Sequence, residues 1–333
     1  MTRLVLLTDG TGQDGTDERT NVAQIEDLLS NGDSRNQYLN YSPGVGTRIG
    51  EEFEGGVFGC HVYRVVNEHY AWLARCAESL QIETSDEIEI ALFGFSRGAF
   101  ISRLIADLLN KCGMPRDSRK ASVLVDMYKK RDWDRIAMWR EANRGTLLSP
   151  SINFLGCWDT VVATFGINAI DYEDVPPNVR NAAHAVAINE SRPKFDYTRM
   201  VLRPGVREEF FAGNHSDVGG GYGDDQVLSR ISLYWMSMMA FNAGVAFNEM
   251  PPHVAAGEYV NAVVHSEHFS KSNGYGALGH HAREIDHSRL NASVPFLPWS
   301  PFGDDEGPLN SELMVARVRE YRDQIGGSGT AVV

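Results

Sequence analysis

Short apolar runs alternate with segments of helical period along most of the chain. The runs end in Asp, Gly or Ser, and apolar residues three and four positions apart follow several of them. Such alternation is typical of βαβ units and a parallel sheet. The pattern therefore predicts an α/β fold with a mainly parallel open sheet and helices on both faces. We expect strands at Arg3–Thr8, Tyr38–Tyr41, 87–95, Ile152–Trp158 and Glu208–Ala212, and helices at Asn21–Ser30, Cys60–Ser79, 97–110, 178–190 and Val227–Ala243.

Three stretches depart from this alternation. Residues 114–148 are rich in Lys, Arg, Asp and Trp, and they predict helices inserted between strands. Residues 44–50 have the glycine spacing G-x-G-x-x-x-G, which differs from the dinucleotide fingerprint, and we expect an active-site loop or lid there rather than a merely structural loop. Beyond residue 245 the periodicity is weak. We therefore expect a main domain at 1–245 and an extension at 246–333 that packs on it as a lid or an interface.

Composition excludes several classes of protein. The 333 residues carry a formal net charge of -13, which argues against binding to nucleic acid. The first apolar run is too short for a signal peptide, and no segment has 18 uninterrupted apolar residues, so we expect a cytoplasmic protein without a transmembrane segment. Export that reads no cleavable signal stays open, as does the oligomeric state.

The sequence Gly94-Phe95-Ser96-Arg97-Gly98 lies between an apolar strand and an apolar-periodic helix. This is the context of a nucleophile elbow, in which a serine occupies a strained turn at the carboxyl edge of the sheet. The glycines two residues to either side remove Cβ atoms that would clash in that turn. We therefore expect Ser96 to be a nucleophile, supported by Gly94 and Gly98.

A serine hydroxyl needs a base, and that base needs an acid to fix its tautomer. In α/β-hydrolases the partners follow in the order Ser, Asp or Glu, His, each after a later strand. Asp159 follows the strand INFLGCW and His215 follows EEFFAG, which reproduces this order. Ser96, Asp159 and His215 are therefore the expected catalytic residues.

Other roles for these residues stay open on the sequence alone. Asp159 also suits a helix N-cap before Thr160, and His215 also suits a core histidine bonded to backbone. Asp217 competes for the acid role, although its spacing favours capping or bracing the turn at 219–221. The rival bases on the tail are His253, His265, His268, His280, His281 and His287.

Acyl transfer also requires an oxyanion hole of backbone N–H groups. The residue after the nucleophile, Arg97, supplies the first donor, and the loop after the first strand offers Gly10 or Thr11 as the second. Asp9 in that loop would repel an oxyanion. We therefore expect its side chain to turn away and to hydrogen-bond loop groups such as Thr11 or Asn21.

Two other classes of function compete with a serine hydrolase. If Asp9, Asp159, His215 and Asp217 converged, they would offer ligands for a divalent metal, as in a metal-dependent phosphoesterase. That hypothesis leaves the Ser96 motif unexplained. The third hypothesis is a non-catalytic binding protein on a hydrolase scaffold. For the serine hydrolase, we expect no cofactor.

Several ordered motifs together resemble a known family. LVLLTDGTG, Thr20-Asn21-Val22, GFSRGAF, FLGCWDTV, HAVAINESRPKF and FFAGNHSDVGGGY resemble the α/β-hydrolase domain of type VI secretion phospholipase effectors and their uncharacterised bacterial, fungal and phage relatives, over about residues 3–245. The resemblance implies a serine hydrolase of small-molecule or lipid esters, with phospholipase A activity in the effectors. It maps the nucleophile to Ser96, the acid to Asp159 and the base to His215.

Overall fold

A single parallel sheet organises the chain. The computed structural model describes residues 1–10, 19–43, 55–162, 175–192, 195–223, 225–255, 258, 262, 264–265, 283, 285–291 and 293. Within them, six strands pair in parallel in the order β2-β1-β3-β6-β7-β8. Their bounds are Thr2–Thr8 (β1), Gln37–Ser42 (β2), Ile88–Phe95 (β3), Ser151–Trp158 (β6), Val179–Ala187 (β7) and Val206–Phe211 (β8).

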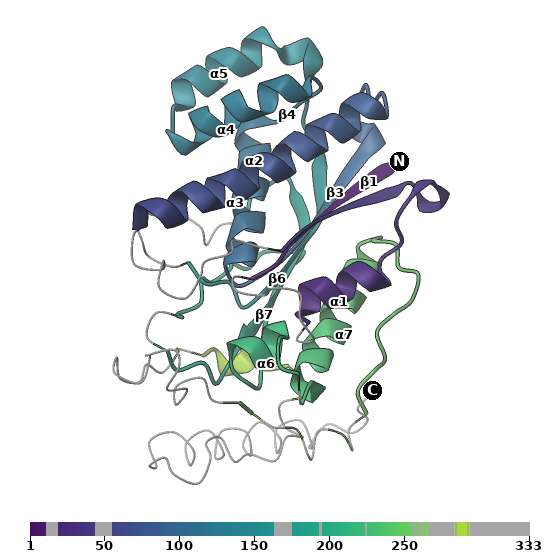
Figure 1. Cartoon of the computed structure of the whole chain (residues 1–333), viewed down its shortest axis with the longest axis vertical. Coiled ribbons are helices and arrows are strands. Elements are labelled where there is room, and N and C mark those ends of the chain that lie inside the picture. Colours follow the sequence, from purple (N-terminus) through teal and green to yellow (C-terminus); the bar gives the residue numbers. More distant parts are fainter. Residues whose placement is uncertain are drawn as a thin grey trace.

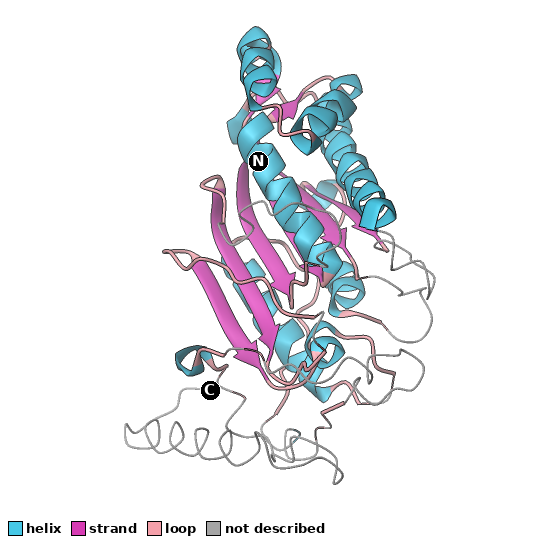
Figure 2. Cartoon of the chain, turned by 90° about the vertical axis from the view of Figure 1, so that its left-hand side faces the viewer, coloured by secondary structure: helices cyan, strands magenta, loops and turns pink. Residues whose placement is uncertain are grey.

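Helices cover both faces of this sheet, as the sequence predicts (Figures 1 and 2). Leu4 and Leu6 of β1 contribute to the hydrophobic core under α2 and α3, whereas Val5 and Leu7 contribute to the core under α1 and α7. Both faces of the strand are apolar because both are buried, as is usual in parallel sheets. The helix bounds are Asn21–Leu28 (α1), Gly55–Ser79 (α2), Arg97–Cys112 (α3), His215–Gly219 (α6) and Val227–Asn242 (α7).

The prediction of a helix at 178–190 is wrong, because this segment forms β7. Its sequence, VRNAAHAVA, is rich in alanine, which has a high helix propensity. The strand lies between β6 and β8, and its last six residues are all buried. Burial on both faces of a sheet therefore overrides the local preference, and the sheet has one strand more than the sequence predicted.

The inserted helices predicted within 114–148 are present. They are α4 (Ala121–Lys129) and α5 (Trp133–Ala142), flanked by a small antiparallel pair, β4 (Met114–Pro115) and β5 (Leu147–Leu148). In Figure 1 they lie at the upper end of the molecule, away from α6. The expected glycine-rich loop at 44–50 lies outside the described residues.

The described part of the extension contacts the sheet domain. Gln37 of β2 hydrogen-bonds to the backbone N–H and C=O of Ala246, at 2.9 and 2.8 Å. Leu290 forms a parallel bridge with Phe210 of the edge strand β8, and the Asn291 N–H donates to the Phe210 carbonyl at 2.8 Å. The boundary at 245 stays a prediction. Of the helices described, none is long and apolar enough to cross a membrane.

Candidate active site

The turn between β3 and α3 holds Ser96 in a conformation that few residues adopt, with φ 57° and ψ -124°. A Cβ atom on Gly94 would lie 2.5 Å from the backbone of Gly98, and a Cβ atom on Gly98 would lie 2.1 Å from the carbonyl oxygen of Thr8. Only glycine fits at both positions. The strand, turn and helix around Ser96 therefore have the geometry of a nucleophile elbow, packed against the end of β1.

Phe95, the residue before Ser96, contacts the ring of His215. The two ring centroids are 4.6 Å apart and the rings are tilted by 35°. The Phe95 ring also occupies the space that Cβ atoms on Gly10 and Gly219 would need, at 3.0 and 2.0 Å. Three loops at the carboxyl edge of the sheet thus meet around this one side chain.

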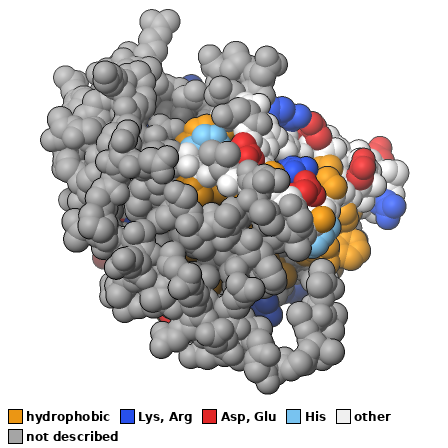
Figure 3. Space-filling model, turned by 90° about the horizontal axis from the view of Figure 1, so that it is seen from below, with side chains coloured by type: hydrophobic (Ala, Val, Ile, Leu, Met, Phe, Trp, Pro, Cys, Tyr) orange, Lys and Arg blue, Asp and Glu red, His pale blue; other side chains and the backbone are white. Residues whose placement is uncertain are grey.

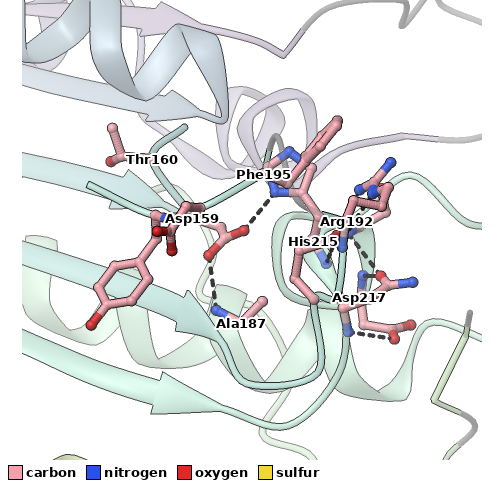
Figure 4. A network of polar contacts seen from close by, with 12 residues as sticks. Asp159, Thr160, Ala187, Arg192, Phe195, His215 and Asp217 are labelled. Atoms are coloured by element: carbon pink, nitrogen blue, oxygen red, sulfur yellow. Dashed lines mark hydrogen bonds and ion pairs between the residues drawn. The ribbon is translucent and has the colours of Figure 1, made fainter. Parts of the chain in front are cut away.

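Asp159 lies directly after β6 with a φ of 39°, and it is fully buried. Its N–H donates to the Ala185 carbonyl at 2.7 Å. Its Oδ1 accepts the Ala187 N–H at 2.9 Å, and its Oδ2 lies 2.6 Å from His215 Nδ1 (Figure 4). The carboxylate therefore bonds across the edge of the sheet instead of capping a helix.

Arg283, from the C-terminal extension, fills the remaining positions around Asp159. Its Nη1 and Nη2 donate to Oδ1 and Oδ2 at 2.6 and 3.0 Å. Burial raises the pKa of Asp159, but the charge of Arg283 and the hydrogen bond from His215 outweigh it, so this pKa lies well below its ordinary value. Asp159 is consequently a carboxylate throughout the neutral pH range.

His215 is the first residue of α6, and the Asn214 side chain caps this short helix. Because the Asp159 carboxylate only accepts hydrogen bonds, Nδ1 of His215 carries the proton and Nε2 is left as an acceptor. Burial lowers the pKa of His215, and the contacts with Asp159 offset this only in part. The ring is therefore neutral at pH 7 and available to take a proton.

An ion pair and an aromatic ring enclose His215 further (Figure 4). Glu190 Oε2 accepts the His215 N–H at 3.4 Å and the Arg192 Nη2 at 2.6 Å. The ring of Phe195 meets His215 edge-on at 5.2 Å, and the Arg192 guanidinium lies 3.5 Å over the Phe195 ring. Burial raises the pKa of Glu190, but Arg192 lowers it by more, so Glu190 is ionised beside the histidine.

Asp9 accepts a hydrogen bond from a loop amide, as the sequence predicts, because the Gly10 N–H donates to its Oδ1 at 2.6 Å. Of the two partners named from the sequence, Thr11 lies outside the described residues. Oδ2 of Asp9 accepts the hydroxyls of Thr20 and Tyr41, at 2.5 and 2.8 Å. Asn21 instead donates to the carbonyls of Val218 and Ser229 and to the Ser232 hydroxyl. Burial raises the pKa of Asp9, and its hydrogen bonds offset this in part.

The expected oxyanion donors lie in different situations. Arg97 is the first residue of α3, where backbone N–H groups have no acceptor within the helix. The Gly10 N–H donates to Oδ1 of Asp9 at 2.6 Å and is thus already engaged. Thr11 lies outside the described residues.

Asp217 has a capping role in α6 and also contacts a second histidine. Its Oδ2 accepts the N–H of Asn214 at 2.9 Å in a capping box. Its Oδ1 lies 2.6 Å from Nδ1 of His265, whose ring stacks on Tyr222 at 3.9 Å. The acid that contacts His215 is therefore Asp159, while Asp217 serves a second histidine that the sequence offered only as a rival base.

His184, which is fully buried, supports the backbone next to Asp159. His184 Nε2 accepts the N–H of Thr160 at 3.0 Å, and its Nδ1 donates to Glu208 at 2.9 Å. A backbone N–H can only donate, which fixes this tautomer. His184 and Glu208 lie on adjacent strands, β7 and β8, and the wrong assignment of β7 as a helix hid their proximity.

Of the four side chains of the metal hypothesis, Asp159 and His215 contact each other, whereas Asp217 and Asp9 have other partners. Both oxygens of Asp159 are bonded to Arg283, Asp217 is bonded to His265, and Asp9 is bonded to two hydroxyls. Within the described part of the chain, no three His, Cys, Asp or Glu side chains are grouped as metal ligands would be. The convergence that this hypothesis needs is not observed.

Among the other rival bases, the structure describes the side chain of His253. His253 packs edge-on against Tyr234 at 4.9 Å. His268, His280 and His281 lie outside the described residues, as does the side chain of His287. The strands point downward in Figure 2, and Figure 3 shows the molecule from that side. The described surface there has histidine beside hydrophobic side chains. An open cleft of about 710 Å³ at the other end, lined by Trp133 and Arg140, contains none of the expected site residues.

The parallel sheet, the helices on both faces and the turn at Ser96 define an α/β-hydrolase-like fold. The family model for the type VI secretion system phospholipase effector Tle1-like catalytic domain matches residues 2–239, and the chain belongs to this family.

Individual relatives are distant. An uncharacterised protein of Saccharomyces cerevisiae, YEL023C, is 26% identical in an alignment of 233 residues that covers 62% of this chain and 34% of the yeast protein. The match thus spans about a third of this curated relative. The Tle1 effector bound to the VgrG spike of the type 6 secretion system is 20% identical, with a TM-score of 0.43 over 67% of this chain and 51% of that one. An uncharacterised protein from Pseudomonas aeruginosa is 18% identical, with a TM-score of 0.47 over 99% of this chain and 60% of that one.

Proposed function

We propose that this protein is a serine hydrolase that cleaves carboxylic esters of lipids through an acyl-enzyme on Ser96. The observation that carries the proposal is the buried contact of 2.6 Å between Asp159 and His215, with the His215 ring in contact with the ring of Phe95, the residue before Ser96. The strained serine follows β3, at the same edge of the sheet as the neutral histidine and the ionised acid. This combination has the components that acyl transfer requires.

In the first half of the reaction, His215 Nε2 takes the proton of the Ser96 hydroxyl while Oγ attacks the ester carbonyl. The imidazolium that forms is stabilised by Asp159, which is already ionised. The Arg97 N–H and a second amide, from Gly10 or Thr11, hold the oxyanion of the tetrahedral intermediate. For Gly10 to be this second donor, its N–H must break its hydrogen bond to Asp9 and donate to the oxyanion instead.

Collapse of the intermediate breaks the bond between the carbonyl carbon and the leaving oxygen, and His215 returns its proton to the leaving alkoxide. The acyl group then remains on Ser96. Water attacks this acyl-enzyme with His215 as the base, and release of the acid restores the free hydroxyl.

The family supports a lipid as the source of the ester. Its model is named for phospholipase effectors and covers residues 2–239, which include Ser96, Asp159 and His215. The acyl chain and the leaving group are not specified by these residues. A chain-length panel of p-nitrophenyl esters, measured beside phosphatidylcholine and phosphatidylglycerol vesicles, determines both preferences.

The direct test is labelling with a fluorophosphonate, which reacts with activated serines. We expect one adduct per chain, located by mass spectrometry on the peptide that contains Ser96. Prior denaturation of the protein is the control and should abolish labelling. If folded protein takes up no fluorophosphonate, or takes it up at another serine, the proposed function is wrong.

The pH dependence of hydrolysis provides a second test. Only neutral His215 can act as base, so kcat/KM should fall as pH drops through the pKa of this residue. Burial lowers that pKa from 6.5, and we therefore expect the midpoint of the acid limb below pH 6.5. The measurement is kcat/KM for a p-nitrophenyl ester between pH 4.5 and 9 at constant ionic strength. A midpoint at or above pH 7 would contradict the neutral resting state of His215.

A further inference from the structure

We propose that Arg283 is a positioning residue of the site, which holds Asp159 and Phe195 in place against His215. Arg283 lies beyond the segment 2–239 that defines the family. The extension thereby supplies part of the support for the acid. The inference deepens the proposed function, because it rests on His215 acting as the base.

The contacts of Asp159 are the first argument. A carboxylate has about four acceptor positions. Here Oδ1 accepts from Ala187 N–H and Arg283 Nη1, while Oδ2 accepts from His215 Nδ1 and Arg283 Nη2. Arg283 thus takes both positions that the sheet and the histidine leave, in a bidentate geometry that fixes the plane of the carboxylate. That plane determines where the ring of His215 points.

The second argument is that the same guanidinium ties two backbone segments together. Nη1 also donates to the Ala187 carbonyl at 2.9 Å, and Nη2 donates to the Phe195 carbonyl. The Phe195 ring packs edge-on against His215. Arg283 therefore fixes one neighbour of the histidine through Asp159 and another through Phe195, with its side chain 1% exposed.

The third argument concerns charge. The charged groups around His215 are the carboxylates of Asp159 and Glu190 and the guanidinium groups of Arg192 and Arg283. Each carboxylate is paired with one arginine, so a proton on His215 adds a net positive charge to a balanced group. Removal of the Arg283 charge leaves Asp159 uncompensated, which favours imidazolium.

The test is an NMR titration of the full-length protein with labelled histidine. The ring signals of His215 are assigned by their loss in His215→Gln and followed against pH in wild type and Arg283→Met. We expect the pKa of His215 to rise by about one unit in Arg283→Met, with kcat for the p-nitrophenyl ester about 10- to 100-fold lower. The titration measures the effect of Arg283 on the pKa of His215 and requires no turnover. It therefore tests the role of Arg283 even if an absence of fluorophosphonate labelling shows that the proposed function is wrong.

Arg3→Met is the matched control. Arg3 also pairs with a largely buried carboxylate, Glu89 at 2.7 Å, but on β1 and β3 near their amino ends. We expect this variant to leave the His215 titration unchanged. An unchanged titration in Arg283→Met, or an equal shift in Arg3→Met, would overturn the proposal.

Arg283→Lys covers the case in which Arg283→Met does not fold. Lysine keeps the charge but lacks the planar fork that bonds both oxygens. We expect a His215 pKa close to that of wild type together with a kcat at least about 10-fold lower and an unchanged KM. Wild-type kcat in folded Arg283→Lys would show that the bidentate contact positions nothing.

Discussion

Ser96→Ala is expected to lower kcat for ester hydrolysis by about 10⁴-fold or more and to leave the free energy of unfolding almost unchanged. The loss follows from removal of the nucleophile, since His215 and Asp159 then have no oxygen to activate. Stability is retained because the Ser96 side chain makes no capping hydrogen bond to α3. The measurements are steady-state kinetics on the preferred ester and urea unfolding followed by circular dichroism.

Ser102→Ala is the matched control for this experiment. Ser102 is a buried serine of the same helix, and its hydroxyl donates to the Phe93 carbonyl at 3.0 Å. The variant should retain activity and lose only about 1 kcal/mol of stability. Hydrolysis that survives in Ser96→Ala at more than a few per cent of the wild-type rate would rule out the acyl-enzyme.

Gly98→Ala is expected to destabilise the protein by at least about 3 kcal/mol and to abolish fluorophosphonate labelling. The new Cβ would lie 2.1 Å from the Thr8 carbonyl oxygen and 2.4 Å from that of Asp9. Both are backbone atoms of the interior strand β1 and its loop, so neither moves without disturbing the sheet. The free energy of unfolding from urea titration measures the cost.

Gly145→Ala is the control, because no atom lies within 4 Å of the position a Cβ would take there. It should be neutral or slightly stabilising, by up to about 1 kcal/mol, since alanine restricts the unfolded chain. Equal stability of the two variants would mean that the elbow packs less tightly against β1 than these contacts indicate.

Much of the fold is predictable because the residues that determine each strand end lie close together in the sequence. The motif at Ser96 has its strand, its helix and both glycines within a few residues, so the sequence contains everything that determines the turn. The order Ser96, Asp159, His215 follows from the strands that precede these residues. The wrong assignment of β7 did not affect it, because Asp159 follows β6 and His215 follows β8. The mistake itself shows the limit of propensity, because whether VRNAAHAVA becomes a strand depends on the neighbours β6 and β8.

The support of the site was not predictable for a different reason. Arg283 is separated from Asp159 by 124 residues, and it lies in a segment whose periodicity is weak. No local pattern indicates which of the 31 lysines and arginines pairs with the acid. Likewise, the contact of Asp217 with His265 spans 48 residues, whereas the spacing of two residues to His215 suggested a local role.

The bridge between Leu290 and Phe210 lies at the edge of the sheet, since β8 is the last strand in the order. The unpaired amides of an edge strand attract strands of other molecules and so promote aggregation. Here the Phe210 carbonyl already accepts the Asn291 N–H. By pairing with this part of the edge, the C-terminal extension reduces the opportunity for β-strand addition between two copies of the chain.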